Sequence, residues 1–137
     1  MQLQRWLRGQ SLRKLGRIYI PVKTGLVGTM SQHWYLVVVH VQDRTIKCSD
    51  SLAGPARSEF MSRVRAFLEE AQDNDGASPE GPVDSRPWVV QETAVYDGRS
   101  LVTPQQTNGV DCAFFTLAAA EFTSRGLPLL YSQAHMG

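Results

Sequence analysis

The chain has 137 residues, of which 42% are hydrophobic and 20% charged, and its formal net charge is +1. This size and composition fit one globular domain with a modest core and exclude a chain that is disordered throughout. Two cysteines are too few for a disulfide framework, and the start of the chain lacks the apolar core of a signal peptide. No apolar run approaches the roughly 20 residues of a membrane-spanning helix. We therefore expect a soluble protein in a reducing, intracellular setting.

The small net charge hides an uneven distribution along the chain. All thirteen carboxylates lie from Asp43 onward, whereas residues 1–42 carry six Lys and Arg and no acid. Three interpretations of this segment are open: a surface that binds an acidic partner, a transit peptide, and a solvated basic face without a partner. Aromatic and basic residues do not alternate in it, so nothing indicates nucleic-acid binding.

The first half of the chain predicts three strands. Residues 1–16 indicate only a weak helix or a ragged end. Residues 17–22, rich in β-branched and aromatic side chains and interrupted by Pro21, predict a short strand near an edge. Residues 33–41 are apolar on both faces, as in a central buried strand, and residues 45–49 follow as the return strand of a hairpin.

The second half predicts two helices and one more strand. An apolar stripe at helical spacing predicts an amphipathic helix; its members are Phe60, Val64, Phe67, Leu68 and Ala71. Residues 73–87 have loop composition, 88–93 that of a strand, and 103–111 that of a turn. A second helix begins at Cys112 and is stopped by Gly126. The order of elements predicts an α+β domain with an antiparallel hairpin.

Cys112 is a candidate nucleophile because of its place at the start of this helix. The unpaired amides and the dipole at a helix amino terminus favour a thiolate, and Asp111 is a plausible N-cap. The alternative is a small apolar residue that begins a packed helix. A thiol protease also needs an imidazole to accept the thiol proton and a third group to orient the imidazole.

His33 and Asp50 are candidates for these two roles, because the hairpin brings them to the same end of a sheet. A symmetric turn centred on Asp43 would set Asp50 opposite Leu36, whose side chain faces away from His33. We therefore expect a bulge or a shifted turn, centred between residues 41 and 42, that sets His33 and Asp50 directly opposite each other.

Gln106 is a candidate donor for an oxyanion, which acyl transfer requires. Its side-chain amide can reach back across the turn before Cys112, and the Cys112 backbone amide is a second donor. Taken alone, a glutamine near a cysteine is better explained as a surface residue.

Three motifs occur in order, "HWYL", "DSL" and "QTNGVDC", with His33, Asp50, Gln106 and Cys112 at compatible spacings. Together they resemble the ubiquitin-like-protein-specific (Ulp/SENP-type) cysteine proteases that process SUMO. The ending "LPLLYSQAHM" resembles plant-type members. The resemblance implies a papain-like α+β core in residues 17–137, lacking the upstream substrate-binding part of the family, after a basic segment in residues 1–16.

The resemblance also implies residue roles. Cys112 would be the nucleophile, His33 the general base, Asp50 the group that orients the imidazole, and Gln106 a side of the oxyanion hole. Trp34 would cover the narrow channel that admits the Gly-Gly tail of the substrate, because only residues without a Cβ pass between aromatic walls. No cofactor or metal is implied. The implied partners are SUMO-like proteins and their conjugates, and the implied compartment is the nucleus, with the cytoplasm as the other option.

Some features depart from the family or remain outside its site. Ala113 stands where family members usually have glycine. We interpret His40, on the opposite face of its strand from His33, and Cys48 as structural residues. Two alternatives stay open: a truncated member that has lost activity and at most binds a ubiquitin-like protein, and an acyltransferase that uses the same order of His, acid and Cys.

Overall fold

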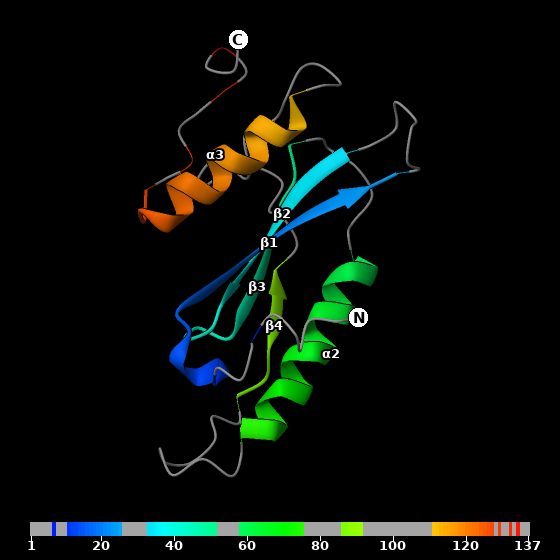
Figure 1. Cartoon of the computed structure of the whole chain (residues 1–137), viewed down its shortest axis with the longest axis vertical. Coiled ribbons are helices and arrows are strands. Elements are labelled where there is room, and N and C mark those ends of the chain that lie inside the picture. The colour runs from blue at the N-terminus through cyan, green and yellow to red at the C-terminus, as the bar shows by residue number, and fades with distance from the viewer. Residues whose placement is uncertain are drawn as a thin grey trace.

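The computed structural model describes residue 7 and residues 11–25, 33–51, 58–75, 86–91, 111–127, 129, 132 and 134. The elements are a short 3-10 helix η1 (Leu12–Lys14), the strands β1 (Arg17–Thr24), β2 (His33–His40) and β3 (Thr45–Ser49), the helix α2 (Ser58–Asp75), the strand β4 (Val89–Gln91) and the helix α3 (Cys112–Ser124). Figure 1 shows α2 and α3 on opposite sides of the sheet. The predicted α+β class is confirmed.

The four strands form one sheet in the order β1-β2-β3-β4. The first three strands are antiparallel neighbours, and β4 joins β3 in parallel. β1 is an edge of this sheet, as its proline predicts, because Pro21 has no amide hydrogen for a second neighbour. The strand continues past the predicted end at residue 22 to Thr24.

Alternate residues of β2 face two separate apolar clusters. Tyr35, Val37 and Val39 join the cluster that α2 covers, to which α2 contributes Met61, Val64 and Leu68. Leu36 and Val38 join the second cluster, with Phe115 and Ala119 of α3. The period-2 alternation of a strand therefore gives β2 a helix on each face, which explains why its sequence is apolar throughout.

The predicted amphipathic helix is present as α2, and its apolar stripe is the face packed on the sheet. It ends at Asp75, so the loop predicted to begin at residue 73 was placed three residues too early. Ion pairs one turn apart, Arg63 with Glu59 and Arg65 with Glu69, lie on its exposed side. None of the helices that the structure describes is long and apolar enough to cross a bilayer.

The turn between β2 and β3 spans residues 41–44 and depends on Arg44. This residue has a φ of 57°, a left-handed conformation that side chains with a Cβ rarely adopt. Its guanidinium lies 4.2 Å from the ring centroid of Trp88 and donates hydrogen bonds to the Gln72 side chain and the Arg86 carbonyl. Contacts to α2 and to the segment entering β4 therefore hold the turn in this conformation.

Candidate active site

His33 and Asp50 are in contact at the open end of the hairpin. Nε2 of His33 lies 2.5 Å from Oδ1 of Asp50, and the two residues are 7% and 8% exposed. Because a carboxylate only accepts hydrogen bonds, Nε2 carries the hydrogen. The neutral imidazole then presents Nδ1 as an acceptor, which is the tautomer that a general base needs.

The register that brings them together is not the expected one. Leu36 pairs with Ser49 and Val37 with Cys48, so the turn is centred between residues 42 and 43. This differs both from the symmetric turn on Asp43 and from the shifted turn between residues 41 and 42. Asp50 follows the last paired residue of β3, and its carboxylate reaches diagonally to His33. The requirement for two directly opposite residues was wrong, because a side chain beyond the end of the ladder also reaches a diagonal neighbour.

Cys112 is the first residue of α3, as predicted, and is 5% exposed. It shares the inner face of the helix with Phe115, Thr116 and Ala119, and the Thr116 hydroxyl donates a 2.9 Å hydrogen bond to the Cys112 carbonyl. Asp111 occupies the N-cap position, as predicted, although its side chain makes no capping hydrogen bond. The helix dipole acts at Cys112 in either case.

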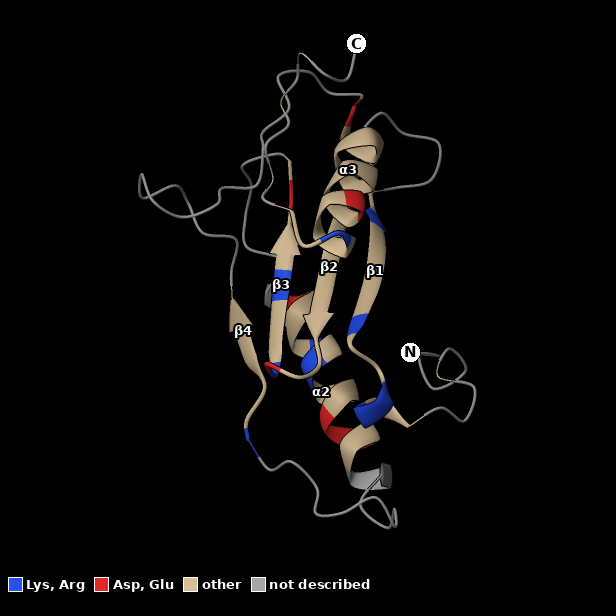
Figure 2. Cartoon of the chain, turned by 90° about the vertical axis from the view of Figure 1, so that its left-hand side faces the viewer, with Lys and Arg blue, Asp and Glu red and all other residues tan. Residues whose placement is uncertain are grey.

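The amino end of α3 and the beginning of β2 lie at the same end of the molecule (Figures 1 and 2). The fold therefore places the thiol at the same end as the imidazole and carboxylate, although Cys112 is 62 residues beyond Asp50 in the chain. No hydrogen bond joins the described side chains of Cys112 and His33. Catalytic hydrogen bonds are often long in the absence of substrate and shorten when it binds.

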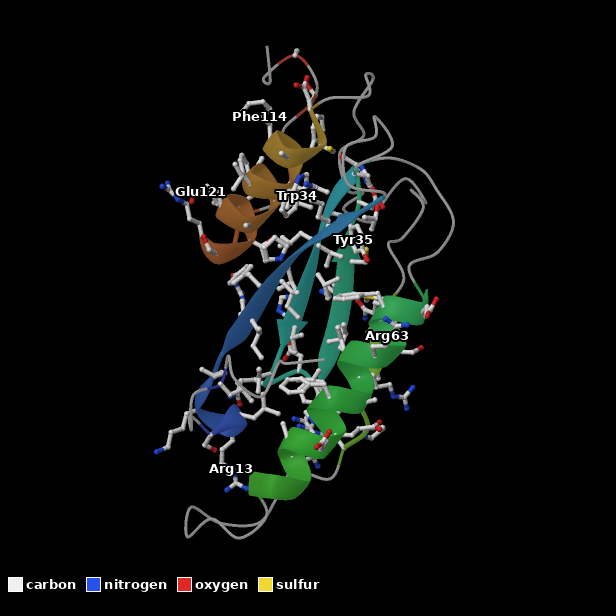
Figure 3. The ribbon with its side chains drawn as sticks, turned by 45° about the vertical axis from the view of Figure 1, so that its right-hand side comes forward. Arg13, Trp34, Tyr35, Arg63, Phe114 and Glu121 are labelled. Carbon is white, nitrogen blue, oxygen red and sulfur yellow. The ribbon has the colours of Figure 1, made fainter. Side chains whose placement is uncertain are left out.

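Trp34 points to the opposite face of β2 from His33. It is half-buried beneath α3, whereas Tyr35 lies on the side of α2 (Figure 3). Its cross-strand neighbour on β1 is Lys23, whose ammonium lies 5.8 Å from the indole centroid. The indole thus sits between the Cys112 helix and a basic side chain at the sheet edge.

Two further residues singled out in the sequence are Gln106 and Ala113. Gln106 and the turn before Asp111 lie outside the described residues. Ala113 is half-buried. Within the described ranges, no three His, Cys, Asp or Glu side chains gather into a group able to hold a metal ion.

The interpretation of His40 and Cys48 as structural residues stays a prediction. His40 shares its face of β2 with Leu36 and Val38, and burial, followed by the charges of Lys47 and Arg17, lowers its pKa below the ordinary value. Cys48 is a buried free thiol in the α2-side cluster.

Two contacts escaped the sequence reasoning, one at the site and one at the far end of β2 and α3. The ring of Tyr35 stacks on the imidazole of His33, and the guanidinium of Arg17 donates to the carbonyl of Thr123 near the end of α3. The alternation along β2 already put Tyr35 and His33 on one face, so that signal was available. The Arg17 contact joins segments 106 residues apart, and no local pattern predicts it.

Comparison with known proteins places these features in a family. A family model described as the Ulp1 protease family, C-terminal catalytic domain, matches residues 2–136. Ubiquitin-like-specific protease 1A of Arabidopsis thaliana is 30% identical over 128 residues, which are 93% of this chain and 22% of that protein.

Solved structures show the same fold. The catalytic domain of the Ulp1-like SUMO protease of Chaetomium thermophilum has a TM-score of 0.69 at 22% identity, covering 98% of this chain and 48% of that one. The yeast Ulp1 protease domain in complex with Smt3, the yeast orthologue of SUMO, has a TM-score of 0.59 at 22% identity, covering 95% and 52%. The chain thus spans about a fifth of the curated relative and about half of the solved chains. Because the family model matches nearly all of its residues, the chain belongs to the Ulp1 protease family, within the C-terminal catalytic domain.

Proposed function

We propose that the chain carries the catalytic residues of a thiol protease that cleaves after the Gly-Gly carboxyl terminus of a SUMO-like modifier, either in a precursor or in a conjugate. The observation that carries this proposal is the buried contact between His33 and Asp50, located at the end of the sheet where Cys112 begins α3. Family membership supports the reaction class.

In the proposed reaction, the Cys112 thiol gives its proton to Nδ1 of His33, and the sulfur attacks the carbonyl carbon of the terminal glycine. The tetrahedral oxyanion collapses and expels the amine, which takes the proton from His33. This leaves a thioester on Cys112. Water then gives one proton to His33 as its oxygen attacks the thioester, and the thiol leaves with that proton. The glycine carboxylic acid that is released gives the second proton of the water to solvent and becomes a carboxylate.

Asp50 orients the imidazole and stabilises its charged form, because its carboxylate accepts the hydrogen of Nε2 throughout. We assign Gln106 and the Cys112 amide to the oxyanion hole, and Trp34 to the wall of the diglycine channel. The half-buried position of Trp34 beneath the Cys112 helix supports that assignment.

The proposed partner is a SUMO-like protein whose surface is acidic. The η1 and β1 segments carry Lys and Arg and no acid, as Figure 2 shows, and Lys14, Arg17 and Lys23 are exposed. Clustered charge of one sign raises the association rate with a partner of the opposite sign. We further propose an intracellular location, in the nucleus, which is the family expectation.

The test is labelling of the purified chain with ubiquitin-like proteins that bear a carboxyl-terminal vinyl sulfone. We expect a covalent adduct with the SUMO-type probe, lost in Cys112→Ser and strongly slowed in His33→Ala. Asp43→Asn, at the other end of the hairpin, serves as a control that keeps the adduct. No adduct from wild-type chain shown to be folded by circular dichroism would refute the proposal.

One observation favours a second candidate, a family member that has lost activity. Phe114 and Leu117 on the outer side of α3 are 56% and 66% exposed, and such apolar surface on a helix usually contacts another segment (Figure 3). This exposed surface, and the absence of a hydrogen bond between the described side chains of Cys112 and His33, both favour a site that lacks a neighbouring segment to hold α3 in place. Binding of a SUMO-type protein without adduct formation would identify this candidate.

A further inference from the structure

We propose that Tyr35 is a positioning residue that sets the plane of the His33 imidazole. The geometry stands independently of any activity, whereas the catalytic consequence rests on the function proposed above. Tyr35 is two residues from His33 on β2, so both side chains project from the same face of the sheet.

The two rings are stacked. Their centroids are 6.5 Å apart and their planes differ by 24°, which falls within the range of interacting aromatic pairs. The imidazole therefore lies beside a nearly parallel flat side chain, while its Nε2 edge meets Asp50.

The sheet register puts Tyr35 beside the path of the carboxylate. Extending the observed pairs Leu36–Ser49 and Val37–Cys48 by one step would set Asp50 opposite Tyr35. Asp50 contacts His33, so its carboxylate passes alongside the Tyr35 position to reach the residue two places before Tyr35 in β2. Tyr35 thus flanks both members of the pair.

A second contact is needed because one hydrogen bond does not fix a ring. The contact between Nε2 and Oδ1 leaves the imidazole free to rotate about the line joining these atoms, and such rotation swings Nδ1 away from the thiol. A nearly parallel ring beside the imidazole limits the space for that rotation. The hydrogen bond selects the tautomer, and the stack selects the direction in which Nδ1 points.

Tyr35 is itself held in place. It is 2% exposed, and Phe60, in the first turns of α2, meets it edge-on, with centroids 6.3 Å apart and planes at 89°. The packing of α2 is thereby transmitted through Phe60 and Tyr35 to the imidazole of His33.

The test compares three variants of the full chain with the wild type. Tyr35→Phe keeps the ring, Tyr35→Leu keeps apolar bulk without a flat face, and Val37→Ala removes buried volume from the same face of β2 one step further from His33. Nuclear magnetic resonance reports the ring-current shift of the carbon-bound His33 imidazole protons. Hydrolysis of a SUMO-type protein with a fluorogenic carboxyl-terminal amide reports kcat and KM.

We expect Tyr35→Leu to lose the ring-current shift and to lower kcat about tenfold, with KM changed less than about twofold, since small misplacements of a catalytic group act on the rate. Tyr35→Phe should retain the shift and most of kcat. Val37→Ala should destabilise the fold without changing either readout. If Tyr35→Leu does not fold, Phe60→Leu replaces it, with a smaller loss in both readouts expected.

An unchanged His33 shift in Tyr35→Leu, or an altered shift with unchanged kcat in an active enzyme, would overturn the assignment. If the wild type reacts with no probe, the proposed function fails, and the imidazole shifts alone still decide whether Tyr35 orders His33.

Discussion

Asp50→Asn is the sharpest test of how the site works, because it removes a charge and leaves the side-chain shape. Both partners of the 2.5 Å contact are more than nine-tenths buried, so the carboxylate is only weakly screened by solvent. A hydrogen bond to a charged group contributes about 1.5–3 kcal/mol and a neutral one about 0.5–1.5 kcal/mol. The expected loss is therefore about 1–2 kcal/mol of stabilisation of the charged imidazole.

At about 1.4 kcal/mol per tenfold in rate, this loss corresponds to a kcat lowered about 5- to 30-fold. The loss would be greater if the amide turned its NH₂ group toward Nε2, because His33 would then carry its hydrogen on Nδ1 and could not accept the thiol proton. KM should change little, since Asp50 lies behind the imidazole.

The assay is hydrolysis of a fluorogenic SUMO-type amide, with urea unfolding to verify that the variant is folded. Asp43→Asn is the matched control, because it makes the same change in charge at the exposed turn of the same hairpin. Wild-type kcat in folded Asp50→Asn, or an equal loss in Asp43→Asn, would show that the buried pair does not act on the reaction.

The remaining predictions concern stability and are read by urea unfolding. Leu68→Ala should lower the free energy of unfolding by about 2–5 kcal/mol because Leu68 is 1% exposed in the core. Leu117→Lys, at a 66% exposed position, should change the free energy of unfolding by no more than about 0.5 kcal/mol. A larger loss in Leu117→Lys than in Leu68→Ala would refute the packing of α2 and α3. Burial, followed by Lys47 and Arg17, lowers the pKa of His40 below 6.5 in the folded chain. As the pH falls, the unfolded chain therefore binds more protons at this histidine than the folded chain does. The contribution of His40 to the free energy of unfolding is intact above pH 6.5 and is lost as the pH falls through 6.5 toward the pKa of the folded chain. His40→Gln should flatten this decline, and an unchanged slope would assign it to other groups.

Features that depend on short-range patterns were predicted from the sequence. The stripe from Phe60 to Ala71 identified α2, and the polar turn residues before an apolar run placed the start of α3 at Cys112. Helix and strand periodicities are properties of neighbouring residues, so they can be recognised without knowledge of the fold. The three motifs around His33, Asp50 and Cys112 indicated the family for the same reason, and the family model confirms it.

The geometry of the candidate site was decided by tertiary structure. The register of the hairpin depends on the left-handed Arg44, which is held by Gln72 and Arg86 from elements far along the chain. That register, which matches neither expected turn, is what makes the His33–Asp50 contact diagonal.

Local spacing along the chain was enough to predict the main helices and strands and to indicate the candidate site residues. Three features became visible only in the folded structure. The helices α2 and α3 cover opposite faces of the sheet, β4 pairs with β3 in parallel, and the ring of Tyr35 stacks beside the His33 imidazole. The physical reason is that these arrangements are set by long-range contacts, whose free energy depends on the whole fold and not on any segment alone.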